Sequence, residues 1–219
     1  MTKHVDELVR VLRAEFSEWK SPGGWPNEAD SALIETVFST RARYEDVVVP
    51  LVNRWRNSSR NPKSGRLSAI LSVDSEEFRE LIGNKQRMPG RGILTPKWQG
   101  VRIVAESLIS QGWDSAEEIR LAATNQPEDF RQEFAKAPGV GRAQYAYFLM
   151  LLGMPGVKAD TLVTAWVERA LGGVRLSQEE VEAIVTAAAL ELNRSPTDVD
   201  HAIWRRESLA RAAKRRKAR

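Results

Sequence analysis

The stretch "KAPGVGRAQYAYFLMLLGMPGVKADTLVTAWVERALG", from Lys136 to Gly172, contains two Pro-Gly-Val turns between helical patterns. The first turn predicts a tight connection between two helices, because Gly139 and Gly141 permit positive φ angles and close backbone approach. The second turn leads to Asp160, which stands where another helical pattern begins. Asp is among the best helix N-cap residues, so one interpretation of Asp160 is that it only caps this helix.

The first turn also predicts an anion site. The helix after it begins with N–H groups that have no intrahelical acceptor, and these groups with the glycine amides suit a phosphate. We therefore expect Gly139, Val140, Gly141 and Arg142 to contact DNA. Glycine pairs also join helices that bind nothing, so a simple connection remains the alternative.

The positive charge of the chain is concentrated in a few stretches. The net charge of the 219 residues is +4, whereas Arg205–Arg219 alone contains eight basic residues and one acid. The segments Arg54–Arg66 and Lys85–Arg102 contain basic residues and no acids. Clustered Lys and Arg suit a phosphate backbone, because each neutralised phosphate releases counterions. The alternative is a set of solvated loops and a solvated tail.

Composition excludes several kinds of site. The chain has no cysteine, which rules out disulfides, thiolate catalysis and cysteine-bound iron–sulfur clusters, and we expect no cofactor. The sequence contains no run of about 18 apolar residues, so we expect no membrane-spanning helix. The N-terminal "MTKHVDELVRVLRAEF" is amphipathic and acid-containing, unlike a signal peptide. We expect a cytoplasmic protein, associated with the nucleoid if it is bacterial.

Helical periodicity covers nearly the whole chain and predicts an all-α protein with many short helices. We expect Ser75 and either Asp114 or Ser115 to cap helices, and Ser177 to form a capping box with Glu180. The stretch "YEDVVVPLVNRW" is helical or helix-like around Pro50. Its Val-Val-Val run at residues 47–49 is the best strand candidate, although no alternating partner strand follows it. The C-terminal pattern predicts a helix that frays toward its end.

The pair of segments "PGVGRAQYAYFLMLLG" and "GVKADTLVTAWVERALG" resembles the helix-hairpin-helix (HhH-GPD) DNA glycosylases of the endonuclease III superfamily. That superfamily has a Leu-Pro-Gly-Val-Gly hairpin, followed some twenty residues later by an aspartate in a Val-Asp-Thr sequence. Here Asp160 lies 160 − 139 = 21 residues after Gly139 and precedes Thr161. Looser matches in the same order extend the resemblance over roughly Leu33 to Glu207.

The resemblance implies two helical domains with a cleft between them. We expect residues 29–136 to form a central domain, and residues 1–28 with 137–219 to form the second, which would contain the hairpin and the basic tail. The hairpin and Asp160 would then meet at the cleft. The expected partner is double-stranded DNA with a damaged or mispaired base, bound by a monomer.

The implied activity is a DNA glycosylase that initiates base excision repair. Such an enzyme rotates a nucleotide out of the duplex, and a carboxylate near C1′ stabilises the positive charge that develops on the sugar. The resemblance assigns this catalytic role to Asp160. Members that also cut the strand carry a lysine two residues after the hairpin, where this chain has Ala143. We therefore expect a monofunctional enzyme without lyase activity.

The resemblance extends to further DNA contacts. Arg41 occupies the position of a side chain that wedges into the duplex, and arginine can stack on bases. Lys158, two residues before Asp160, is expected to contact DNA as well. The superfamily often binds a metal ion at the hairpin, so a monovalent ion is expected at the carbonyls of Ala137 and Gly139.

Several polar and aromatic residues keep two interpretations. Tyr145 and Trp98 are candidates to line the base pocket, and the alternative for both is packing in the core. Gln144 stands where the superfamily has small residues, and it either shapes the pocket or packs. His201 lies near two aspartates, but helical spacing argues against a metal site.

Two other functions remain open. The first is a catalytically inactive helix-hairpin-helix DNA-binding protein, to which Asp160 is the main objection. The second is a helical interaction protein with no role in nucleic-acid binding, to which the basic segments and the hairpin are the objection. The sequence does not identify the base that would be removed.

Overall fold

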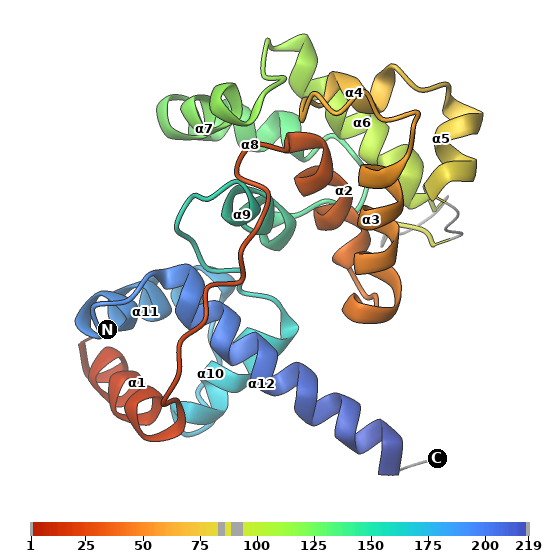
Figure 1. Cartoon of the computed structure of the whole chain (residues 1–219). Coiled ribbons are helices and arrows are strands. Elements are labelled where there is room, and N and C mark those ends of the chain that lie inside the picture. The colour runs from red at the N-terminus through yellow and green to blue at the C-terminus, as the bar shows by residue number, and fades with distance from the viewer. Residues whose placement is uncertain (1, 83–85, 89–93, 218–219) are drawn as a thin grey trace. The chain divides into compact units, whose positions relative to one another are not determined.

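The computed structural model describes residues 2–82, 86–88 and 94–217, except for the side chains of 215–217. Throughout these residues the regular structure is helical, apart from one isolated bridge between Arg87 and Pro96 (Figure 1). The predicted all-α fold class is therefore confirmed. Among the described helices, none has the length and apolar character needed to cross a membrane.

The chain divides into two compact units, and each has its own apolar core. Unit 1 comprises Met1–Gly23 and Pro155–Arg219. Its helices are α1 (Thr2–Glu15), α10 (Thr161–Ala170), α11 (Gln178–Glu191) and α12 (Pro196–Lys217), and Figure 1 shows them together. The core contains buried aliphatic side chains from all four helices and Trp166. Burial of these side chains is the main favourable contribution to the stability of the unit.

Unit 2 comprises Gly24–Met154. Its elements are α2 (Ala29–Ser39), η1 (Tyr44–Val48), α3 (Val49–Asn57), α4 (Ser68–Leu71), α5 (Ser75–Ile82), α6 (Lys97–Ser110), α7 (Ala116–Asn125), α8 (Pro127–Phe134) and α9 (Arg142–Leu151). Helix α2 is buried along nearly its whole length and packs against α6, α9 and α3. It is therefore the central helix of this unit.

Capping residues place several helix starts where the sequence predicts them. Ser115 and Glu118 form a capping box on α7, and Ser177 and Glu180 form another on α11. In each box the serine hydroxyl accepts from one backbone amide while the glutamate accepts from another. Helix α12 differs from the prediction, because it continues to Lys217 instead of fraying earlier.

Residues 47–49 are helical, as expected around Pro50, and are not the strand that the Val-Val-Val run also allowed. They end a π-helical turn and begin α3, where Pro50 suits the first turn of a helix. The bounds of the compact units are not those of 29–136, because α9 and the hairpin before it belong to unit 2. Phe148 of α9 stacks on Phe134 with ring centroids 5.1 Å apart, which joins α9 to the same core as α8.

Candidate DNA-binding and catalytic site

The hairpin between α8 and α9 has the tight geometry that its glycines predict. Gly139 has a φ of 80°, in the left-handed region that favours glycine. The amide of Val140 donates to the carbonyl of Ala137 at 3.2 Å, which closes the turn. Gly141 is extended and precedes the first residue of α9, Arg142. The carbonyl of Ala137 thus already accepts one hydrogen bond and has one remaining lone pair for an ion.

Gln144 changes the anion site that the glycines predict. Its Oε1 accepts the hydrogen bond of the Gly141 amide at 3.0 Å, so this N–H is occupied. The amides of Gly139 and Ala143 donate to no acceptor among the described residues. In this conformation the hairpin therefore offers a phosphate fewer N–H donors than the sequence predicts. The Gly141 amide becomes available only if Gln144 moves.

The same glutamine connects the hairpin to the turn after α2. Gln144 Nε2 donates to Thr40 Oγ1 at 3.0 Å, and Thr40 immediately precedes Arg41. Arg41 is exposed and has a φ of 53°, which is costly for a residue with a side chain. Among the described residues it has no hydrogen bond or ion pair. The structure therefore holds an unpaired arginine in a strained backbone conformation.

Lys97 fixes the end of α2 just before this turn. Its side chain is buried, and Nζ donates to the carbonyls of Phe38 at 3.1 Å and Thr40 at 2.6 Å and to Gln86 Oε1 at 2.7 Å. These three acceptors match the three donors of an ammonium group. Burial nevertheless lowers the pKa of Lys97 to about 8, because the charged form loses hydration. Lys97 and Gln144 together hold Thr40 and so the backbone that presents Arg41.

Unit 1 contains the predicted catalytic carboxylate as the N-cap of α10. Asp160 Oδ1 accepts from the amides of Leu162 at 2.8 Å and Val163 at 3.1 Å. Oδ2 accepts no hydrogen bond from the residues that the structure describes. The side chain is half-buried. The cap therefore fixes the carboxylate through one oxygen and leaves the other available to a ligand or to water.

The segment before this cap is held by side chains from α11 and α12. Thr197 Oγ1 accepts from the Gly156 amide at 3.0 Å, Asp200 Oδ1 accepts from the Lys158 amide at 2.9 Å, and Gln178 Nε2 donates to the Ala159 carbonyl at 3.0 Å. Each bond joins the segment to a residue far away in the sequence. The position of Asp160 is thus set by two other helices as well as by its own cap.

Asp200 is a second carboxyl group close to Asp160. It is buried, and burial followed by the charge of Asp160 raises its pKa well above the usual range, against the opposing effect of Lys158. Sequence reasoning considered Asp200 only beside His201 as a metal mimic. Among the described residues, no group of three or more His, Asp or Glu side chains could hold a metal ion. No local pattern in the sequence predicts the hydrogen bond that Asp200 accepts from the Lys158 amide.

The two aromatic candidates for the base pocket pack against the core of unit 2. The ring of Tyr145 lies 5.9 Å from Phe130 and 6.0 Å from Phe134, centroid to centroid. Trp98 is half-buried at the start of α6 and packs against the same core. These contacts support the packing interpretation of both residues.

Unit 2 also contains a buried carboxylate that the sequence did not single out. Glu35 of α2 accepts from Trp25 Nε1 at 2.7 Å, from the Tyr44 hydroxyl at 2.9 Å and from the Tyr147 hydroxyl. Burial and the nearby charge of Glu35 raise the pKa of both tyrosines, so they stay neutral donors. The cluster joins α2 to α9 and to the segment before α2, and thereby fixes the helix whose end carries Arg41.

A solved structure with a similar fold gives these sites a context. It is described as "Structure of a Trapped Endonuclease III-DNA Covalent Intermediate: Estranged-Adenine Complex", with a TM-score of 0.51 and 18% sequence identity over 90% of this chain and 82% of that chain. At this identity the likeness concerns the fold, which is the all-helical fold of endonuclease III. No curated protein matches the sequence. A family model matches residues 3–208, and the chain belongs to the family it describes, a domain of unknown function (DUF8548).

Proposed function

We propose that this chain is a DNA glycosylase that hydrolyses the N-glycosidic bond of a damaged or mispaired base in double-stranded DNA. The observation that carries the proposal is Asp160, whose Oδ1 is fixed by two α10 amides while Oδ2 has no partner among the described residues. The likeness of the fold to an endonuclease III–DNA complex supports DNA as the partner.

The carboxylate of Asp160 would act on a nucleotide that has been rotated out of the duplex. Cleavage of the bond between C1′ and the base develops positive charge on the sugar, which a fixed negative charge stabilises. The free Oδ2 can also orient or deprotonate the water that attacks C1′. The cap role is compatible with this function, because the cap bonds occupy only Oδ1. They also keep the side chain from rotating.

The remaining parts of the proposal concern DNA binding. The hairpin from Gly139 to Arg142 contacts a phosphate, Arg41 enters the duplex beside the displaced nucleotide, and Lys158 contacts the strand near Asp160. A chain that binds DNA through these residues but releases no base is the alternative function. The protein is proposed to act as a monomer, which light scattering on the DNA complex can test.

We propose that the enzyme does not cut the strand. The similar solved structure is described as a trapped covalent intermediate of endonuclease III with DNA. A covalent intermediate through a Schiff base needs an amine at the sugar, and the position that carries it in related enzymes is Ala143 here. Borohydride is therefore expected not to trap this chain on a lesion duplex. A trapped adduct through Lys158 or another lysine contradicts this part of the proposal.

The decisive experiment compares wild type with Asp160→Asn on duplexes that carry a panel of modified and mispaired bases. Strand breaks that appear only after hot alkali identify a monofunctional glycosylase. Asn remains a competent cap, so we expect a roughly hundredfold or larger loss of base release with a change in unfolding free energy below about 1 kcal/mol. The matched control is Ser177→Asn, which changes the cap of α11 and leaves base release unchanged. Full base release by the Asp160→Asn variant reduces Asp160 to a helix cap.

A further inference from the structure

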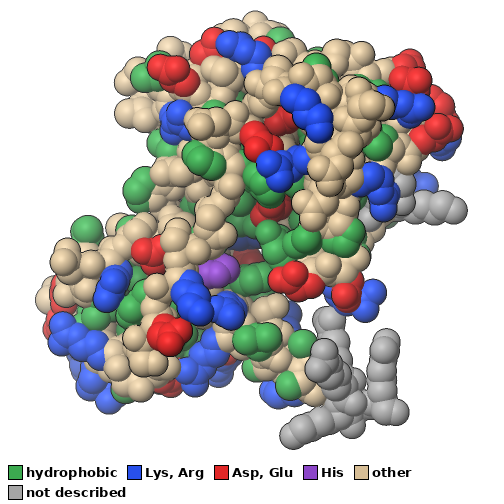
Figure 2. All heavy atoms as spheres, in the orientation of Figure 1, with side chains coloured by type: hydrophobic (Ala, Val, Ile, Leu, Met, Phe, Trp, Pro, Cys, Tyr) green, Lys and Arg blue, Asp and Glu red, His purple; other side chains and the backbone are tan. Residues whose placement is uncertain are grey.

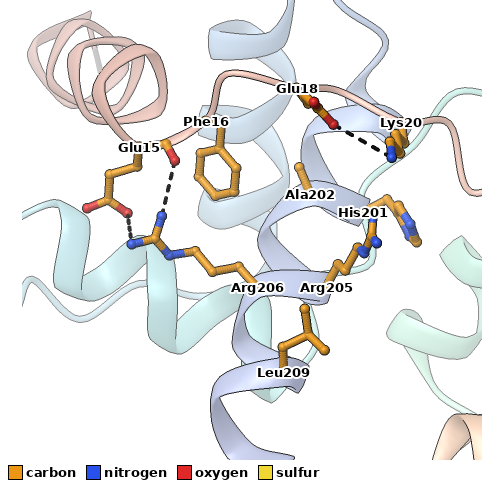
Figure 3. Close-up of a pocket in the computed structure, with 9 residues that line it drawn as sticks. All are labelled: Glu15, Phe16, Glu18, Lys20, His201, Ala202, Arg205, Arg206 and Leu209. Atoms are coloured by element: carbon orange, nitrogen blue, oxygen red, sulfur yellow. Dashed lines mark hydrogen bonds and ion pairs between the residues drawn. The ribbon is translucent and has the colours of Figure 1, made fainter. Parts of the chain in front are cut away.

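A groove in unit 1 is formed by the segment that follows α1 and by the middle of α12 (Figure 3). Its volume is about 280 Å³. Pockets that enclose a whole small molecule measure roughly 300–1,000 Å³. The groove is thus suited to one compact group rather than to a large ligand. Its apolar surface comes from Phe16, Ala202 and Leu209, and its charged side chains are three basic and two acidic ones.

Most of the acidic charge at the groove is already neutralised. Arg206 pairs with Glu15 at 3.1 Å, donates to the Glu15 carbonyl at 3.2 Å, and lies over the ring of Phe16. Glu18 forms an ion pair of 3.6 Å with Lys20, and both side chains are largely exposed. An exposed pair of this kind contributes at most about 1 kcal/mol, so Lys20 can exchange Glu18 for another anion at little cost.

Two other basic groups face the groove from α12. Arg205 has no hydrogen bond or ion pair with any residue that the structure describes, and its side chain points to the same side as Lys20 and His201 (Figure 3). The ring of His201 stacks on Trp204 at 5.9 Å. In Figure 2 the visible face of this unit likewise shows a histidine side chain with Lys or Arg side chains beside it. The groove therefore brings together an unpaired guanidinium, an exchangeable ammonium and an imidazole.

We propose that Lys20, His201 and Arg205 form an anion site that binds one phosphate group of the DNA backbone. Guanidinium and ammonium groups donate only, and a phosphate offers acceptor oxygens to Arg205, which has none among the described residues, and can replace Glu18 as the partner of Lys20. The choice of DNA as the source of the phosphate rests on the proposed function, whereas the site itself does not. It lies on a different surface element from the hairpin and adds a second phosphate contact.

Proton uptake accompanies binding at this site. In the free protein, burial and the positive charge of Arg205 lower the pKa of His201, against the opposing effect of Asp198. Lys20 and Arg206 add positive charge across the groove, and Glu15 and Glu18 add negative charge. A bound phosphate favours the protonated imidazole and raises its pKa. Affinity for the phosphate is therefore expected to rise as the pH falls through the pKa of His201.

The two histidines of the chain make this change measurable. His4 lies on α1, has no part in the groove and serves as an internal control in the same spectrum. Imidazole resonances of both residues are followed by NMR as a function of pH in the free protein, with inorganic phosphate, and with an undamaged duplex. We expect the pKa of His201 to rise with phosphate and with duplex, whereas neither ligand should change the resonances of His4.

Variants of the full chain test the contact with DNA. The variants Arg205→Gln and Lys20→Gln should each bind duplex with a weaker salt dependence. The slope of log K against log salt is expected to become shallower by about 0.9 for each contact removed. At 0.1 M monovalent salt, relative to 1 M, that corresponds to about an eightfold loss of affinity per contact. Arg13→Gln, which removes an exposed charge from α1 outside the groove, is the matched control and should lose less.

The outcomes separate this site from the proposed function. A rise in the pKa of His201 with both ligands that is lost when Arg205→Gln and Lys20→Gln are combined in one chain supports the proposal, whether or not the chain releases a base. A response to inorganic phosphate but not to duplex overturns DNA as the occupant. An unchanged His201 titration with both ligands overturns the site, even if Asp160-dependent base release is found.

Discussion

The two segments proposed to act on DNA are held in different ways. The hairpin from Ala137 to Gly141 is closed mainly by bonds among its own residues and Gln144, with one long-range bond from Gln144 to Thr40. The segment from Gly156 to Asp160 is instead held by Thr197, Asp200 and Gln178, which come from two other helices. The hairpin is thus a local structure, whereas the position of Asp160 depends on the packing of unit 1.

This difference determines which substitutions should harm each segment. Changes in the hairpin itself should alter the proposed phosphate contact and leave the rest of the fold intact. Changes on α12 act on Asp160 although they are distant from it in sequence. The following predictions test that contrast.

The largest effect is expected from Asp200. Asp200→Ala leaves the part-buried Lys158 amide without this acceptor, and loss of such a hydrogen bond costs about 1 kcal/mol of unfolding free energy. If the segment then shifts, base release falls by an order of magnitude or more, because roughly 1 Å of misplacement is costly. Asp200→Asn keeps an acceptor of the same shape and should keep base release. Urea unfolding and single-turnover kinetics measure the two effects, and equal base release by both variants would show that the bond does not position Asp160.

The pH dependence of stability tests the protonation of Asp200. Its folded-state pKa lies above the unfolded value, so its contribution to stability is full below about pH 4 and is lost as the pH rises through the folded pKa. Asn does not titrate. The unfolding free energy of Asp200→Asn, minus that of wild type, should therefore increase as the pH rises above about 4. A constant difference over this range contradicts the raised pKa.

Arg41 should separate stability from DNA binding. In Arg41→Gly, the left-handed backbone is no longer strained, which offsets the greater entropy of the unfolded glycine and raises stability by up to about 1 kcal/mol. Duplex affinity should fall, because the side chain that enters the DNA is gone. Asn193→Gly is the control, since Asn193 has a φ of 52° after α11 and no proposed DNA contact. Loss of stability in Arg41→Gly would mean that the arginine holds the fold itself.

A smaller effect is expected from the link between the hairpin and the Arg41 turn. Thr40→Val removes the hydroxyl that accepts from Gln144 and should cost about 1 kcal/mol. Because Lys97 still holds the Thr40 carbonyl, the turn persists and duplex affinity changes only a few-fold. Ser39→Ala, one residue earlier, is a matched loss of a hydroxyl that bonds within α2. Equal effects of the two variants on affinity would argue against coupling through Gln144.

The smallest effect is expected from the C-terminal tail. Removal of residues 214–219 takes away five positive charges, those of Lys214, Arg215, Arg216, Lys217 and Arg219. If the tail follows the backbone, affinity decreases for every duplex alike and the salt slope falls by up to about 0.9 per contact. Base preference should not change. Identical salt series for the intact and shortened chains would show that the tail is only a solvated end.

Local patterns predicted the fold class, the caps of α7 and α11, the hairpin and the N-cap role of Asp160. Each depends on residues that are close together in the sequence. The bonds that Asp200 and Thr197 make could not be predicted, because they join positions about forty residues apart. The place of α9 in unit 2 could not be predicted for the same reason, since it depends on bonds between distant positions, such as those from Tyr147 to Glu35 and from Gln144 to Thr40.

Stop codons at different positions along helix α12 should have sharply different consequences. Of this 22-residue helix, a stop codon at position 214 removes only residues 214–217. A stop codon at 205 also deletes Arg205 and Glu207, which pairs with Arg169 of α10 at 2.7 Å. One at 196 deletes both Thr197 and Asp200, and with them two of the three bonds that hold the segment before Asp160. A stop codon at 214 should therefore leave Asp160 held in place, whereas one eighteen codons earlier should abolish its function.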